Sequence, residues 1–515
     1  MSTTTSPARF QRVDYAIYAA LAGMKMWVHI AATRHDGMFR DEFYYLACAS
    51  RLDWGYVDQP PLSIVILALW RALFGDSLLA VRMPAILAVG AIVVLLGMMT
   101  RRMGGGRFAQ GFTMFCFIIC PMMLGIHSYF SMNTFDHLFW VLAAYLLVVL
   151  IQTGNPVNWL WFGLVCGLGL QNKMSMLFFG IGVVAALVFT PQRKWFRSPW
   201  LYAGGIIALL IFLPNLLWQN SHGFATLEFM SNAALYKNSY MPPWSFLLAL
   251  VLEYHPLLAP LWVMGVAYPF VKPEAQEWRP LAILFLAVLV VFTFSSGKTY
   301  YMAPAFLMVL PLASIWVERL TEGTKTWRPG ISYVLFAGAL IIAPIALPFL
   351  PPKDYSSYAS AIGFAPAPAE KDHSGELPQH VADRFGWRDR AELVKKAYDS
   401  LSPEEQAKCV IYGPDYGEAA AMEYYAEELG LPRSVSGHNN FWLWGPGDAT
   451  GEVVIVIAEP DSGVLPLFES VQDMGVVTTK VAKFQLEDWQ AKHVYIARGL
   501  KSPIAEIWES LRHYI

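Results

Sequence analysis

The stretch Arg34–Leu62, RHDGMFRDEFYYLACASRLDWGYVDQPPL, follows the first hydrophobic segment and combines acidic with aromatic residues. Asp41 and Glu42 are adjacent acids, and in a helix Asp41 and Tyr45 would share one face at i,i+4. The pair Pro60–Pro61 must end any helix that arrives from the N-terminal side, because proline lacks an amide donor and restricts its predecessor. The stretch therefore predicts a carboxylate on a short amphipathic helix at the surface of a bilayer.

The composition of the whole chain points to a membrane protein. Of its 515 residues, 56% are apolar and only 15% are charged, whereas a soluble domain has about 25% charged residues. The formal net charge of −2 argues against nucleic acid as a partner. The five cysteines lack paired spacing and predict neither a disulfide framework nor a metal cluster.

A hydrophobic helix of ~20 residues spans a bilayer, and the sequence contains about eleven such runs. They are residues 15–33, 82–100, 108–126, 134–151, 157–171, 174–190, 200–218, 244–267, 281–296, 301–317 and 331–350. The apolar run 61–75 is too short to span and is predicted to be an interfacial helix. The N-terminus has no cleavable signal pattern, so the first run is expected to stay as an anchor.

The loops favour one orientation of these spans. With the N-terminus in the cytoplasm, the inside segments carry more Lys and Arg than the outside segments. Eleven spans then place the residues after Leu350 outside. The acidic and aromatic loops, including 34–62, 127–133, 171–174, 219–243 and 295–301, are expected on that same outer face.

The composition changes after Leu350. Residues 1–350 are predicted to be the membrane domain with a first outer loop at 34–81, and residues 351–379 read as a linker. Residues 380–515 are predicted to form a soluble α/β domain with a largely parallel sheet, from strands at 409–413, 452–458 and 493–499 alternating with helices at 416–429, 463–473 and 502–512.

Three acids are candidates for chemistry. Asp41 and Glu42 could act as a general base or cation ligand beside the membrane, or could simply cap a helix. Asp136 follows Asn133 and Thr134, either of which could cap the fourth span. An acid just inside a span is costly and usually faces a cavity, which favours a functional role for Asp136.

Two lysines, Lys173 and Lys298, lie in predicted outer loops that carry few other cations. A lysine ammonium suits a phosphate or pyrophosphate, although a single lysine beside the membrane more often reaches to the headgroups. Their presence on the face that carries the acids favours anion binding. Other ionisable residues fall within spans and could pair with one another: Lys25, His29, Glu253 and His255.

Six segments, in order, resemble one family. They are DEFYY, LDWGYVDQPPL, MNTFDHLFWVLAAY, GLGLQNKMSMLFFG, LPNLLWQNSHGFATLEF and GKTYYMAPAFLMVLP. Together they resemble the bacterial family 39 membrane glycosyltransferases of the GT-C fold, which are related to dolichyl-phosphate-mannose protein mannosyltransferases and lipid A aminoarabinose transferases. GPDYGEAAAMEYY and SGHNNFWLWGP, near the C-terminus, resemble the soluble domain of one bacterial branch.

The resemblance implies inverting transfer of a hexose or pentose from a polyprenyl-phosphate donor at the outer face of the bacterial inner membrane. Asp41 matches the first-loop acid, as general base supported by Glu42, and Asp136 matches the second acid. Lys173 and Lys298, with Tyr300 and Tyr301, would hold the donor phosphate. The substrate pocket is expected to include Tyr44, Tyr45, Tyr56, Asp58, Gln59, His127, Asn133, His222, Glu253 and His255. The family often has His before the double proline, where this chain has Gln59.

Several points stay open at this level. Some relatives use a divalent cation such as Mg²⁺ or Mn²⁺ and others do not. The acceptor could be a glycolipid, a polysaccharide or a protein, and the C-terminal domain is expected to help bind it, with 439–444 facing the membrane. The alternatives are a polymerase or ligase that uses a pyrophosphate-linked donor, and a secondary transporter with an outer sensor domain. The absence of an internal repeat counts against the transporter.

Overall fold

The computed structural model describes residues 11–33, 37–237, 241–295, 297–364, 377–478, 484 and 492–515. The chain divides into two compact units. The first unit comprises Met1–Arg34, Arg82–Leu217 and Ser239–Leu347, and the second comprises His35–Val81, Trp218–Asn238 and Pro348–Ile515. The first outer loop predicted at 34–81 therefore groups with the C-terminal residues rather than with the membrane helices.

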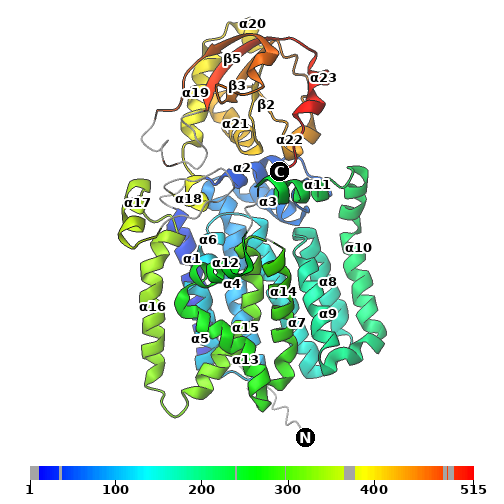
Figure 1. Ribbon diagram of the computed structural model, residues 1–515, viewed down its shortest axis with the longest axis vertical. Coiled ribbons are helices and arrows are strands. Elements are labelled where there is room, and N and C mark those ends of the chain that lie inside the picture. The colour runs from blue at the N-terminus through cyan, green and yellow to red at the C-terminus, as the bar shows by residue number, and fades with distance from the viewer. Residues whose placement is uncertain are drawn as a thin grey trace. The chain divides into compact units, whose positions relative to one another are not determined.

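The first unit is made of helices, which run side by side in Figure 1. Its elements are α1 (Arg12–Ala32), α4 (Leu78–Arg102), α5 (Arg107–Ile119), α6 (Pro121–Ile126), α7 (Met132–Thr153), α8 (Asn158–Asn172), α9 (Met176–Val188), η2 (Pro191–Arg197), α10 (Pro199–Ser221), α12 (Pro243–Glu253), η4 (Pro256–Leu258), α13 (Ala259–Val271), η5 (Pro273–Trp278), α14 (Arg279–Phe294), η6 (Thr299–Met302), α15 (Ala303–Leu320) and α16 (Trp327–Ala346). The candidate span that contains α15 is the most enclosed one, with 83% of its most apolar stretch buried inside the protein. α15 packs against α5, α7, α13 and α14.

Helices occupy all eleven segments that the sequence predicts, but not all of them are continuous. Among the described residues, six helices are long and apolar enough to cross a membrane, or up to eight if each of two bent pairs is one span. The predicted span 108–126 is split at Pro121, and 244–267 is bent by 99° between α12 and α13, beside Pro256. Proline removes an amide donor from the helix ladder, which accounts for both breaks.

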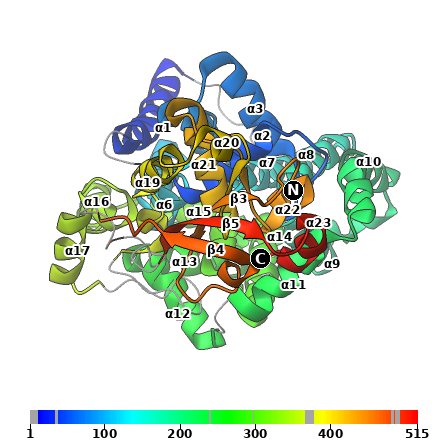
Figure 2. The same cartoon turned by 90° about the horizontal axis from the view of Figure 1, so that it is seen from above.

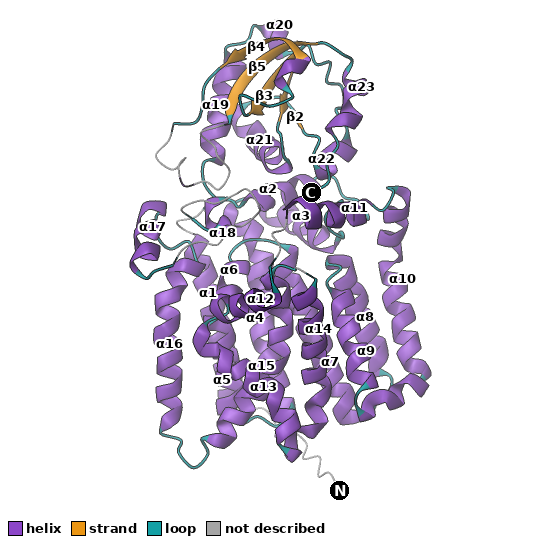
Figure 3. Ribbon diagram, viewed as in Figure 1, coloured by secondary structure: helices purple, strands orange, loops and turns teal. Residues whose placement is uncertain are grey.

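The second unit contains all the strands (Figure 3). Its elements are α2 (Arg40–Ala49), α3 (Leu62–Phe74), α11 (Ala225–Asn232), the π-helical turn η3 (Ala233–Lys237), α17 (Pro352–Ala361), α18 (Gln379–Ala382), α19 (Trp387–Asp399), α20 (Pro403–Gln406), β1 (Cys409–Tyr412), α21 (Tyr416–Leu429), β2 (Ser434–Val435), α22 (Asn439–Trp444), β3 (Val453–Ala458), η7 (Leu465–Leu467), β4 (Phe468–Asp473), β5 (His493–Leu500), α23 (Ile504–Trp508) and η9 (Glu509–Leu511).

The five strands form one mixed sheet in the order β2-β1-β3-β5-β4. Figure 2 shows the neighbouring strands β3, β5 and β4 from above. β1 pairs in parallel with β2 and β3, whereas β5 pairs antiparallel with β3 and β4. The prediction of a largely parallel sheet was therefore only half correct. The predicted helix at 463–473 was wrong, because β4 lies there at the sheet edge with five of its six side chains exposed, and an exposed edge strand lacks the apolar alternation of a half-buried one.

The predicted linker at 351–379 is partly ordered, since α17 occupies Pro352–Ala361, while residues 365–376 lie outside the described residues. The predicted interfacial helix at 61–75 forms α3, which buries Ile64 and Leu67 and exposes Leu69 and Leu73. The predicted helix is therefore present, and its place at a membrane interface stays a prediction.

Candidate active site

Helix α2 presents the first pair of acids. Glu42 provides the hydrogen-bond acceptor at the N-terminus of this helix. Its carboxylate is fully buried and accepts a hydrogen bond from the backbone N–H of Phe39 at 2.8 Å. Glu42 thus caps the helix, as acids near helix starts commonly do. Asp41 is instead partly exposed, with 30% of its side-chain surface accessible, so only the first acid of the pair is open to a substrate.

Asp41 has a specific partner in the second unit. The hydroxyl of Tyr416, at the start of α21, donates to Asp41 Oδ1 at 2.8 Å. The guanidinium of Arg40 lies 4.0 Å from the same oxygen. Asp41 and Tyr45 lie four residues apart on α2 and share a helix face as predicted, while Tyr416 supplies the hydrogen bond to Asp41.

A second polar cluster lies beside Asp41, around Tyr44, which is three residues further along α2. The Tyr44 hydroxyl is 3.0 Å from Asp58 Oδ1 and 3.0 Å from Asn440 Oδ1, and Asn440 Oδ1 also accepts the Val57 backbone N–H at 2.7 Å. Burial, reinforced by the charge of Asp41, raises the pKa of Asp58 to about 7. The Tyr44 hydroxyl has one proton and cannot donate to both Asp58 and Asn440. If Asp58 is protonated, it donates to the Tyr44 oxygen while Tyr44 donates to Asn440, and every group of the cluster is satisfied.

Hydrogen bonds of Tyr56 stabilise the loop that follows α2. Its hydroxyl lies 3.2 Å from the carbonyl oxygens of both Cys48 and Arg51, and its backbone N–H donates to the carbonyl of Gln59 at 2.9 Å. The side chain of Gln59 is fully buried, and neither amide atom has a hydrogen-bond partner among the described residues. A buried unpaired amide costs about 1–3 kcal/mol per group.

In the first unit, the predicted lysine and acid lie together at the turn between α8 and α9. Lys173 Nζ donates to Asn133 Oδ1 at 2.5 Å, and Ser175 Oγ donates to Asp136 at 2.5 Å. Asn133 and Asp136 are three residues apart on α7 and so share a helix face. These two hydrogen bonds fasten the lysine-bearing turn to α7.

The two predicted tyrosines complete this cluster. The ammonium of Lys173 lies 5.5 Å from the ring centre of Tyr300 and 5.1 Å from that of Tyr301, both on η6. Cation–π contacts of this kind hold a cation without neutralising it. Lys298 is half-buried and immediately precedes η6. The arrangement anchors the Lys173 side chain in one place, as an anion site requires.

The remaining predicted pocket residues have mainly structural contacts. His222 stacks on Trp218 with ring centres 4.1 Å apart, and His255, with a φ of 94°, caps η4 by accepting the Leu257 N–H at 3.0 Å. His127 Nε2 lies 2.8 Å from His137 Nδ1 inside the first unit. Glu253 accepts a hydrogen bond from Thr299 on η6.

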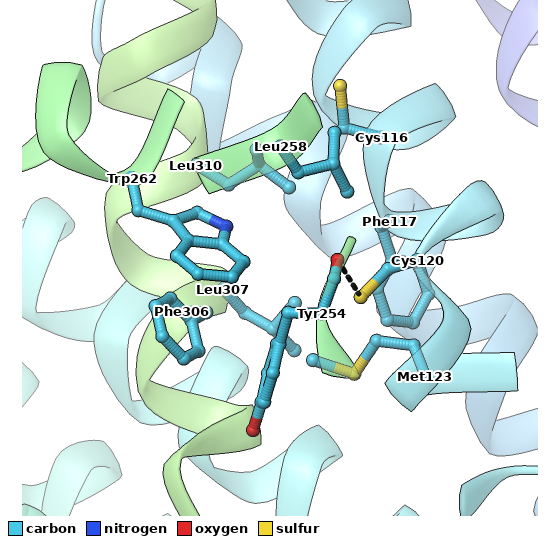
Figure 4. A pocket seen from close by; sticks show the side chains of 10 residues that line it. All are labelled: Cys116, Phe117, Cys120, Met123, Tyr254, Leu258, Trp262, Phe306, Leu307 and Leu310. Atoms are coloured by element: carbon cyan, nitrogen blue, oxygen red, sulfur yellow. Dashed lines mark hydrogen bonds between the residues drawn. The ribbon is translucent and has the colours of Figure 1, made fainter. Parts of the chain in front are cut away.

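A small, largely apolar pocket lies next to η6 in the first unit (Figure 4). The hydroxyl of Tyr254, one of its lining residues, donates to the Thr299 carbonyl at 3.1 Å. The rings of Trp262 and Phe306 also line the pocket, with their centres 4.3 Å apart and their planes tilted by 41°. Sequence reasoning missed this pocket, because its residues come from separate helices and read as ordinary apolar positions.

The described residues contain no group of three or more His, Cys, Asp and Glu side chains placed to hold a metal ion. Each candidate acid instead accepts a hydrogen bond of its own: Glu42 from Phe39, Asp41 from Tyr416 and Asp136 from Ser175.

Comparisons with known proteins place this geometry in context. A family model described as dolichyl-phosphate-mannose-protein mannosyltransferase matches residues 58–218. The chain is 26% identical over 323 residues to an undecaprenyl phosphate-alpha-4-amino-4-deoxy-L-arabinose arabinosyl transferase of Pseudomonas fluorescens, a match covering 58% of this chain and 56% of that protein. The corresponding transferase of Pseudomonas aeruginosa is 25% identical over 316 residues, covering 57% of this chain and 56% of that one. The chain thus spans just over half the length of the curated relatives it matches.

The similarity to solved structures extends over nearly the whole chain. ArnT from Cupriavidus metallidurans in the apo state superposes with a TM-score of 0.60 at 15% identity, covering 94% of this chain and 97% of that one. The same protein bound to undecaprenyl phosphate gives a TM-score of 0.58 at 15% identity, with 95% and 98% covered. The chain has the GT-C fold. The resemblance to the mannosyltransferases and aminoarabinose transferases is thereby confirmed.

Proposed function

We propose that this GT-C chain is a membrane glycosyltransferase that moves one sugar from a polyprenyl-phosphate donor to an acceptor hydroxyl. The observation that carries the proposal is the anchored ammonium of Lys173, held by Asn133 and by the rings of Tyr300 and Tyr301. A donor phosphate bears negative charge that grows as the sugar departs, and a fixed cation stabilises that charge without reorganisation. The printed names of the curated relatives, undecaprenyl-phosphate-dependent transferases, support the same donor class.

In the proposed reaction, the acceptor oxygen bonds to the anomeric carbon while the bond from that carbon to the phosphate oxygen breaks. The acceptor proton passes to Asp41 as general base, and the polyprenyl phosphate leaves with the electron pair, stabilised by Lys173 and Lys298. A single displacement inverts the anomeric configuration. Asp136 positions the lysine turn through Ser175, and Glu42 keeps α2 capped.

We place the reaction at the outer face of a bacterial inner membrane, with eleven spans, the N-terminus in the cytoplasm and residues 380–515 in the periplasm. The excess of Lys and Arg in the opposite loops supports this orientation. The acceptor is defined here only by its hydroxyl group, whether a glycolipid, a polysaccharide or a protein carries it.

The test is transfer by the purified protein, with radiolabelled sugars on polyprenyl monophosphate and on polyprenyl pyrophosphate. The proposal expects label to leave the monophosphate donor and to reach an acceptor hydroxyl with inverted configuration. Turnover only of the pyrophosphate donor would instead favour the polymerase or ligase. Solute uptake into proteoliposomes without any turnover of donor would favour the transporter.

A further inference from the structure

Side-chain hydrogen bonds join helix α2 and the loop after it to the C-terminal residues of the second unit. The Tyr416 hydroxyl donates to Asp41, and Asn440 lies within hydrogen-bond distance of both Tyr44 and the Val57 backbone N–H. Asp41 and Tyr44 are three residues apart on α2, so the two contacts lie on one face of the helix. The C-terminal residues therefore fix both the helix that carries the proposed base and the loop that follows it.

Tyr416 is itself held rigidly. Its side chain is buried, with the ring 4.8 Å from that of Tyr44 and 4.9 Å from that of His438. The guanidinium of Arg40 lies 5.4 Å from the centre of the same ring. Because the ring is packed on several sides, the hydroxyl has little freedom to leave Asp41.

The backbone beneath Tyr416 is fixed by His438. The Tyr416 N–H donates to His438 Nδ1 at 3.3 Å, and His438 Nε2 lies 2.8 Å from the carbonyl oxygen of Ile515. With Nδ1 as acceptor, the ring proton must sit on Nε2 and point at Ile515. Burial lowers the pKa of His438 to about 3, so the imidazole stays neutral and this tautomer persists at neutral pH.

The hydroxyl can act only as a donor toward Asp41. Burial raises the pKa of Tyr416 well above its usual value, so the phenol remains protonated at neutral pH. A protonated phenol 2.8 Å from Oδ1 occupies one lone pair of that oxygen. The carboxylate is thereby held in one rotamer, with Oδ2 left to accept a proton from an acceptor hydroxyl.

We propose that Tyr416 is a positioning residue for sugar transfer, which orients Asp41 from the C-terminal part of the chain. This inference rests on the proposed function and gives the C-terminal residues a role in the chemistry itself. A misplaced base loses rate rather than donor affinity, because the donor contacts are left intact. The inference therefore predicts a loss of kcat with an unchanged donor KM.

The matched pair of variants is Tyr416→Phe and Tyr424→Phe. Both tyrosines lie on α21, and both hydroxyls bond to residues of the 35–81 segment, since Tyr424 donates to the Asp76 carbonyl at 3.3 Å. Only Tyr416 touches Asp41. Each substitution keeps the ring and removes one hydrogen bond, so any general loss of stability, measured as Tm, should be similar in the two variants.

We expect Tyr416→Phe to lower kcat about 10-fold, with donor KM within twofold of wild type, and Tyr424→Phe to leave both unchanged. In an Asp41→Asn background, Tyr416→Phe should cause no further loss, because the group it orients is no longer a base. A Tyr416→Phe protein with wild-type kcat would overturn the positioning role. An equal loss of kcat in the wild-type and Asp41→Asn backgrounds would overturn it as well. Either result would leave the proposed function intact. A wild-type protein that turns over no polyprenyl-phosphate donor would overturn the function itself, and the positioning role with it.

Discussion

At the scale of the residue, the first unit's candidate site depends on how one lysine is held in place. Lys173 is bound by an amide oxygen and two aromatic faces rather than by a carboxylate. A direct ion pair would cancel the charge that an anionic donor needs, whereas neutral partners orient it and leave it available.

Lys173→Gln should weaken donor binding by roughly 10- to 100-fold, the value of one charge-assisted hydrogen bond of about 1.5–3 kcal/mol. The control is Lys194→Gln, since the Lys194 ammonium also lies over an aromatic ring, 5.4 Å from the centre of Trp195. Equilibrium binding of a labelled polyprenyl-phosphate sugar measures both. Equal affinities in the two variants would remove Lys173 from the donor site.

Asp58 predicts a pH dependence of stability. Burial raises its pKa from 3.8 to about 7 in the folded protein, so the folded state holds a proton that the unfolded state has lost between those values. The stabilisation is complete below pH 3.8 and is lost as pH rises toward 7. Relative to Asp58→Asn, wild-type Tm should fall between pH 5 and pH 8, by roughly 2–4 °C for each kcal/mol lost. Parallel Tm curves for the two proteins would show that Asp58 is already ionised at pH 5.

The sequence identified the charged residues of the candidate sites but not the residues that they contact. Asp41, Asp136 and Lys173 stand out because ionisable groups are rare in an apolar chain. Tyr416 and Asn440 could not be assigned from the sequence, since each lies more than 370 residues from its partner on α2. Local sequence patterns do not predict contacts between residues that lie so far apart in the chain.

At the scale of the element, close helix contacts depend on missing side chains. A Cβ on Gly163 of α8 would lie 2.1 Å from the carbonyl oxygen of Gly204 on α10, and a Cβ on Gly204 would lie 2.2 Å from that of Trp159. The two helices therefore meet backbone to backbone, as small residues allow in membrane proteins.

Gly204→Ala should lower Tm, because the methyl group forces α8 and α10 apart at a cost of about 1–3 kcal/mol. Gly205→Ala is the control on the same helix, since nothing lies within 4 Å of its Cβ position. Thermal unfolding in detergent compares them. A Gly204→Ala protein as stable as Gly205→Ala would contradict the close contact.

The positions of helices were more predictable than their continuity. Hydropathy located all eleven helical segments, because apolar length is a strong signal. It did not reveal that Pro121 and Pro256 break two of them, since each proline is embedded in an apolar run. Edge strand β4 was missed for the opposite reason, because its side chains are mostly polar and exposed.

At the scale of the whole molecule, the orientation in the membrane can be tested by chemical labelling. A cysteine at Ser502 near the C-terminus should react with an impermeant maleimide in intact cells whose outer membrane is permeable. A cysteine at Thr324, between α15 and α16, should react only after lysis. Both positions are exposed, and a Cys166→Ser background removes the half-buried native thiol. The reverse pattern would invert the proposed topology.

The most direct test of the account is turnover by Asp41→Asn, with Asp53→Asn as its control. Asp53 lies in the same loop, is exposed and accepts a hydrogen bond from Trp218 Nε1 at 2.8 Å. With a polyprenyl-phosphate sugar, Asp41→Asn should bind donor normally while kcat falls about 10²- to 10⁴-fold, the loss expected for a general base. Asp53→Asn should retain wild-type kcat. Normal turnover by Asp41→Asn would contradict the account and would leave Asp41 only a partner of Tyr416 at the start of a helix.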